Sequence, residues 1–190
     1  MAQTSANENS AEAVLITGVY GSGKSSVAQE IAALLEKDHA PYALLDLDFL
    51  AWFDAEDGPT EYRMMLTNLA AVTGNYLAVG VRYFVLAYAV RDGAELDGLK
   101  AELSMPLKVV RLTVPLGEIE ARLHSDVTSG RRDDLREAGV WLAGSLGAGI
   151  EGLTVSNERP IREVAAGILD WLGWPGTAGT RPIPRANRTP

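Results

Sequence analysis

Residues 18–25 read GVYGSGKS, and this stretch decides the fold. It matches the pattern G-x-x-x-x-G-K-[ST] without a gap. The glycines Gly18, Gly21 and Gly23 let consecutive backbone N–H groups approach an anion, and they can adopt positive φ. A helix that begins at Lys24 would point its positive end at the same anion. The stretch therefore predicts a loop that holds the phosphates of a nucleotide.

Polar side chains in and after this loop are candidate ligands for a nucleotide and its metal ion. Lys24 would bring an ammonium group to the β- and γ-phosphate oxygens. Ser25 would offer its hydroxyl to Mg²⁺, and Ser26 is a lesser candidate in the same helical turn. Ser22 lies within the loop and is counted among the nucleotide contacts. The predicted cofactors are ATP and Mg²⁺.

Short apolar runs alternate with helical patterns through the rest of the chain. Strands are predicted at 14–17, 42–47, 83–90, 107–113 and 153–155, and helices at 24–38, 61–79, 94–103, 116–125, 134–143 and 161–172. This alternation is typical of βαβ units, in which helices cover both faces of a mostly parallel sheet. We therefore expect an α/β domain over residues 12–174, with disordered tails at 1–11 and 175–190.

Composition and charge exclude several classes of protein. The 190 residues, 47% apolar, suit one globular domain, and no apolar stretch approaches the ~18 residues of a membrane span. The net charge of −8 makes a nucleic-acid partner unexpected, because such binding depends on neutralising phosphates. Without cysteine, disulfides and thiolate metal sites are impossible, and no secretory signal is recognisable. A soluble cytoplasmic protein without a membrane partner is expected.

Two carboxylates stand where the second predicted strand runs out. Asp46 and Asp48 are separated by one residue, a spacing that on a strand directs both side chains to the same side. Ligands of open parallel sheets bind outside the carboxyl ends of the strands, so both should face the phosphate loop. Phosphoryl transfer needs a proton acceptor and a ligand for Mg²⁺. We assign the first role to Asp48 and the second, or a substrate contact, to Asp46. The alternative is that one of them only caps the segment that follows.

These features resemble the P-loop small-molecule kinases, the group of adenylylsulfate kinase, gluconate kinase, shikimate kinase and chloramphenicol phosphotransferase. The resemblance covers about residues 12–174 and is strongest at 18–25. It implies the P-loop NTPase fold, a five-stranded parallel sheet in the order 2-3-1-4-5 with a lid over ATP. It also implies that Asp48 is the catalytic aspartate and that Asn157 to Arg159 lie where the chain wraps the adenine.

Arginines cluster around the polar stretch 126–130. They are Arg122, Arg131, Arg132 and Arg136. An arginine on a closing loop can stabilise the charge of a transferred phosphoryl group and exclude water. The kinase resemblance implies that Arg122 contacts the adenine and that Arg131 or Arg132 contacts phosphate, and we favour Arg132 as catalytic. The alternative is that these arginines form solvated surface pairs with neighbouring acids.

An ATPase motor is the rival interpretation of the second strand. Ala43 to Asp46 also resembles a Walker B strand, but no glutamate follows Asp46 to activate water. Asp92, after the third predicted strand, is a weaker candidate for the Mg²⁺ shell.

The sequence thus predicts an enzyme that moves the γ-phosphoryl group of ATP to a hydroxyl of a small molecule. The acceptor alternatives are a sugar acid, a nucleoside, a nucleotide, or a natural product such as an antibiotic. An NTP-binding regulator or slow NTPase with a protein partner is the second hypothesis, and a polynucleotide kinase, disfavoured by the acidic charge, is the third. Other candidates for the acceptor site, which no spacing rule selects, are Trp52, Phe53, Glu61, Arg63, Asn68, Arg82 and Tyr88. Oligomeric state has no signature in the sequence.

Overall fold

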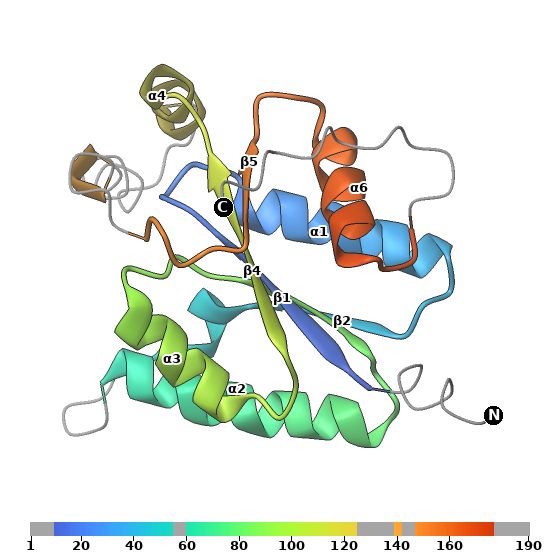
Figure 1. Ribbon diagram of the computed structural model, residues 1–190. Coiled ribbons are helices and arrows are strands. Elements are labelled where there is room, and N and C mark those ends of the chain that lie inside the picture. The colour runs from blue at the N-terminus through green and yellow to red at the C-terminus, as the bar shows by residue number, and fades with distance from the viewer. Residues whose placement is uncertain (1–9, 55–59, 125–138, 142–146, 177–190) are drawn as a thin grey trace.

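A five-stranded parallel sheet between two helical layers forms the part of the chain described by the computed structural model, residues 10–54, 60–124, 139–141 and 147–176 (Figure 1). The strands are β1 (Glu12–Thr17), β2 (Tyr42–Asp46), β3 (Tyr83–Ala87), β4 (Leu107–Thr113) and β5 (Leu153–Ser156). The helices are α1 (Lys24–Lys37), α2 (Glu61–Ala78), α3 (Gly93–Glu102), α4 (Leu116–His124) and α6 (Ile161–Leu172), with a 3₁₀ helix η1 (Leu47–Leu50).

The strand order is β2-β3-β1-β4-β5, and every adjacent pair is parallel. This confirms the predicted α/β class and the order 2-3-1-4-5. The first strand therefore lies at the centre of the sheet, so the loop that follows it is flanked by β3 and β4. None of the helices within the described residues is long and apolar enough to span a bilayer.

Alternate residues of the central strand pack against different helical layers. Val14 and Ile16 face the layer of α1 and α6, whereas Ala13 and Leu15 face the layer of α2 and α3 (Figure 1). Because both faces are covered, β1 is buried along almost its whole length. This double burial explains why its sequence is apolar without a polar alternation.

Two predicted strands end earlier in the structure than in the sequence analysis. The second ends at Asp46, because the Asp46 carboxylate accepts the backbone N–H of Asp48 (3.3 Å) and caps the 3₁₀ helix that follows. The expectation that Asp46 and Asp48 share one side of a strand is therefore wrong. The third strand ends at Ala87, although the apolar run continues to Val90. The apolar run predicted too long a strand, because Val90 is fully buried although it lies outside the strand. Its backbone N–H donates to the Thr17 hydroxyl (3.1 Å).

A partly buried ion pair fastens the edge strand β5 to β4. Arg111 Nε donates to Glu151 Oε1 (2.8 Å), and the Thr154 hydroxyl donates to the same oxygen (2.9 Å). Burial raises the pKa of Glu151, but the hydrogen bonds from Arg111, its own backbone and Thr154 outweigh this, so its pKa is lowered from 4.5. The stability that Glu151 contributes is therefore present above pH 4.5 and is lost as the pH falls through the lowered value.

Replacing Glu151 with glutamine is expected to lower the free energy of unfolding at neutral pH by about 1.5 kcal/mol, because a charged hydrogen bond is lost. The difference from the parent protein should shrink as the pH falls below 4.5, where Glu151 itself becomes neutral. Urea unfolding across this pH range checks the result, with Glu36→Gln on the exposed side of α1 as the control. An equal loss at every pH would contradict it.

Candidate active site

The loop between β1 and α1 has a backbone that excludes side chains at two positions. Gly18 has φ +142°, and a Cβ there would lie 2.7 Å from the Leu112 carbonyl oxygen. Gly23, the N-cap of α1, has φ +91°, and a Cβ there would lie 2.5 Å from Asn157 Nδ2. The glycines that the sequence motif selected are thus required by backbone conformation and by close neighbours.

The ammonium group of Lys24 is held inside the loop. Lys24 is 8% exposed, and its Nζ donates to the Val19 carbonyl (3.3 Å). The same nitrogen lies 5.1 Å from the centre of the Tyr20 ring, which in turn contacts Trp141 edge-on (6.3 Å). A buried positive charge at a helix N-terminus is an arrangement that attracts a polyphosphate.

Ser25 and Asp46 are brought together at the first turn of α1. The Ser25 hydroxyl donates to Asp46 Oδ2 at 2.6 Å, although the residues come from different elements. Ser25 and Ser26 are both exposed. A hydroxyl beside a carboxylate is a pair of hard oxygen ligands of the kind that Mg²⁺ prefers. The structure therefore assembles the two residues that the sequence analysis assigned to the metal.

Asp48 lies at a cavity of about 780 Å³ beside the loop. It is exposed, on η1, and Tyr20 of the loop borders the same cavity. The cavity thus adjoins both the loop and the carboxylate predicted to act as base. Its lining is Tyr20, Asp48, Ala51, Trp52, Phe53, Thr60, Glu61, Tyr62, Met65, Tyr88, Ala89, Arg91 and Glu95.

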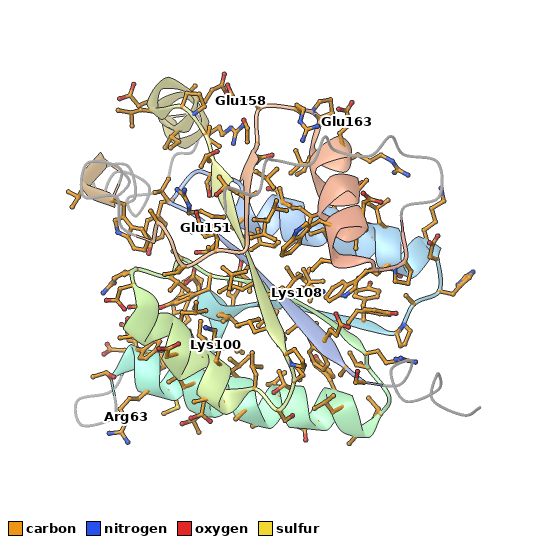
Figure 2. All side chains as sticks on the ribbon, viewed as in Figure 1. Arg63, Lys100, Lys108, Glu151, Glu158 and Glu163 are labelled. Atoms are coloured by element: carbon orange, nitrogen blue, oxygen red, sulfur yellow. The ribbon has the colours of Figure 1, made fainter. Side chains whose placement is uncertain are left out.

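The sequence candidates for an acceptor site divide into two groups. Trp52, Phe53, Glu61 and Tyr88 line the cavity, whereas Arg63, Asn68 and Arg82 do not. Arg63 is exposed near the N-terminal end of α2, at the periphery of the molecule (Figure 2). Asn68 has a supporting role instead, because its side chain donates to the Leu50 carbonyl (2.8 Å) and holds the end of η1.

Two tyrosines of the cavity, Tyr62 and Tyr88, have a raised pKa. Burial raises the pKa of Tyr88 strongly, and the negative charges of Glu95 and Asp48 raise it further, while Arg91 opposes them. Burial also raises the pKa of Tyr62, with Glu95 and Asp92 adding to the effect. Both phenols therefore remain protonated at neutral pH and can act as hydrogen-bond donors, not as bases.

Asn157 and Arg122 support the loop through hydrogen bonds to backbone carbonyl groups. The Asn157 side chain is buried and donates to the Ser22 carbonyl (2.8 Å). Arg122 donates to the Asn157 carbonyl (2.9 Å) and, at 3.5 Å, to the carbonyls of Gly21 and Ser22. This role of the Asn157 side chain was missed by sequence reasoning. A lone asparagine after a short strand carries no signal of a contact so distant in sequence.

Replacing Asn157 with alanine is expected to weaken nucleotide binding about tenfold, because the buried Ser22 carbonyl loses the shorter of its two hydrogen bonds and the loop loosens. Titration with a fluorescent ATP analogue measures the change. Ser156→Ala, at the exposed neighbour whose hydroxyl contacts Glu158, is the matched control and should leave the affinity unchanged. Equal affinities of Asn157→Ala and the parent protein would show that this support is dispensable.

The remaining candidates have varied positions. Asp92 accepts the backbone N–H of Glu95 (2.9 Å) and caps α3, so its carboxylate serves the helix. Arg159 is exposed in the segment after β5. The predicted lid arginines Arg131, Arg132 and Arg136 lie outside the described residues.

Solved structures similar to this chain share its fold over most of their length. The Deinococcus radiodurans tunicamycin resistance protein has a TM-score of 0.59 and 18% identity, covering 86% of this chain and 96% of its own. The Mycobacterium tuberculosis APS kinase, solved with AMPPNP and APS, has a TM-score of 0.58 and 22% identity, covering 86% and 98%. The chain has the P-loop NTPase fold.

The Acinetobacter baumannii shikimate kinase, solved with shikimate, also matches, with a TM-score of 0.54 and 19% identity, covering 87% of this chain and 94% of its own. The predicted resemblance to P-loop small-molecule kinases is thus confirmed at the level of the fold. No family model and no curated protein sequence matches the chain.

Proposed function

We propose that the protein is an ATP-dependent phosphotransferase that moves the γ-phosphoryl group to a hydroxyl of a small molecule. The observation that carries this proposal is that one cavity is bordered both by Tyr20 of the P-loop and by Asp48. A phosphate donor in the loop and an alcohol in the cavity would then lie on either side of a carboxylate.

The residues present fit both ATP and Mg²⁺. Gly18 and Gly23 form a cradle that a Cβ would fill, and Lys24 is held within it. The Ser25 hydroxyl and the Asp46 carboxylate, 2.6 Å apart, form a donor set suited to Mg²⁺. When bound, the metal ion would neutralise charge on the phosphate oxygens.

In this mechanism each residue has a distinct task. Lys24 binds the phosphates and stabilises the charge that develops on them. Asp46 orients the Ser25 hydroxyl through their hydrogen bond. Asp48 accepts the proton of the acceptor hydroxyl, which positions its oxygen for attack. Arg132 is proposed to close over the transferred group and exclude water, and Arg122 and Arg159 to lie beside the base of the nucleotide.

Incubating the protein with ATP, Mg²⁺ and a panel of hydroxylated metabolites and antibiotics tests the proposal. Mass spectrometry should show one compound that gains a phosphoryl group. Release of inorganic phosphate without any modified compound, and stimulated by a protein partner, would instead support the NTP-binding regulator. Both hypotheses use the same P-loop, so the fate of the phosphoryl group separates them.

A further inference from the structure

The charged side chains of the cavity are mostly acidic. Among the described residues, its lining includes Asp48, Glu61, Glu95 and Arg91. Arg91 and Glu95 form an ion pair, with Arg91 Nε 3.9 Å from Glu95 Oε1, and the backbone N–H of Arg91 donates to Glu95 Oε2 (2.8 Å). Three carboxylates against one guanidinium give the described lining an acidic balance of formal charge.

Aromatic side chains supply much of the remaining surface. Five of them line the cavity: Tyr20, Trp52, Phe53, Tyr62 and Tyr88. Trp52 is 81% exposed and stacks on Phe49, itself 67% exposed, with ring centres 5.7 Å apart and planes inclined by 23°. A flat apolar surface of this kind, left in water at the rim of a cavity, gains free energy when an apolar ligand covers it.

Carboxylates of the cavity lie near two of its tyrosine hydroxyls. Burial is the largest cause of the raised pKa of both Tyr62 and Tyr88, Glu95 raises both further, and Asp48 adds to that of Tyr88. Carboxylates therefore lie close enough to act on phenols of two different segments, and Arg91 opposes them at Tyr88. A bound anion would experience the same repulsion.

We propose that the acceptor is an alcohol without net negative charge, neutral or cationic, which lays an aromatic or other flat apolar face on Trp52. This inference rests on the proposed phosphotransferase function. An anionic acceptor would bring its charge next to Asp48 and Glu61, whereas an ammonium group would be attracted by them. The bound APS and shikimate of the two solved kinases are both anions, so the proposed class differs from theirs.

Binding of matched alcohols to the full chain with AMPPNP and Mg²⁺ tests the charge preference. The probes are hydroxylated aromatic compounds in pairs that differ only in amide against carboxylate, such as 3-phenyllactamide and 3-phenyllactate, with phenylalaninol as a cation. Ligand-observed NMR titrations should give amides and cations at least about tenfold tighter binding than carboxylates. Carboxylates that bind as tightly as their amides, or a panel in which no compound binds, would overturn the inference.

Variants locate the binding to this cavity. Trp52→Ala should weaken binding of the amides about tenfold, because the stacking surface is lost. Glu61→Gln should reduce the ratio of amide affinity to carboxylate affinity about threefold. Glu36→Gln, on the opposite helical layer, should leave this ratio unchanged. A preference that is insensitive to both cavity variants would place the ligand elsewhere and overturn the inference.

Transfer from ATP to the same probes, followed by ³¹P NMR, separates this inference from the function on which it rests. Transfer to carboxylates at the same rate as to their amides would contradict the proposed acceptor class but would support the phosphotransferase function. If the cavity binds the probes according to their charge but no alcohol is phosphorylated, the phosphotransferase function is contradicted, and with it the proposed acceptor class. The expected result is transfer confined to neutral and cationic alcohols.

Discussion

Replacing Asp48 with asparagine is expected to slow phosphoryl transfer about 10³-fold while nucleotide affinity stays within about twofold of the parent protein. Asparagine keeps the size of the side chain but cannot accept the proton of an attacking hydroxyl. Nucleotide binding should survive because Asp46 accepts the hydrogen bond of the Ser25 hydroxyl at the first turn of α1. Rates of product formation and titration with an ATP analogue measure the two quantities.

The matched control for this variant is Asp54→Asn. Asp54 is an exposed aspartate six positions further along, beyond η1, and it does not line the cavity. It should transfer phosphate at the parental rate. If both variants lost activity equally, or if Asp48→Asn failed to bind nucleotide, the assignment of Asp48 as base would be wrong.

Replacing Lys24 with methionine is expected to slow transfer at least about a hundredfold and to weaken nucleotide binding, because the positive charge inside the loop is removed. Methionine is similar in length and apolar, so it suits a position that is 8% exposed. Thermal unfolding of the variant should therefore stay close to that of the parent. Steady-state kinetics and nucleotide titration check the effect.

Lys37→Met serves as the control on the same helix. Lys37 is exposed in the last turn of α1, and its substitution is chemically identical. It should leave binding and transfer unchanged. Parental nucleotide affinity in Lys24→Met would contradict the account of the P-loop.

The P-loop and the parallel sheet were predictable because their signals are local. Gly18 to Ser25 is a contiguous motif, and the buried strands are apolar over consecutive residues. Strand order is different, since it depends on pairings such as that of Ala13 with Phe84, between residues far apart in sequence. The kinase resemblance supplied the order, which periodicity alone does not contain.

Details of the site depend on local capping and on distant contacts. Asp46 ends its strand by accepting the N–H of Asp48, and this cap competes with continued strand pairing. The direction of Asp48 therefore could not be inferred from strand alternation. Likewise, the Asn157 side chain reaches Ser22 across the fold, and Tyr62 reaches the cavity from α2. Such neighbours are set by tertiary packing, which a single sequence does not display.

A crystal structure of the full chain with AMPPNP and Mg²⁺ is the most direct measurement of this account. The expected electron density has the terminal phosphate beside Lys24, the metal ion on the Ser25 hydroxyl, and the Asp48 carboxylate facing the phosphate across the mouth of the cavity. A nucleotide bound away from residues 18–25, or an Asp48 side chain turned from the terminal phosphate, would contradict it.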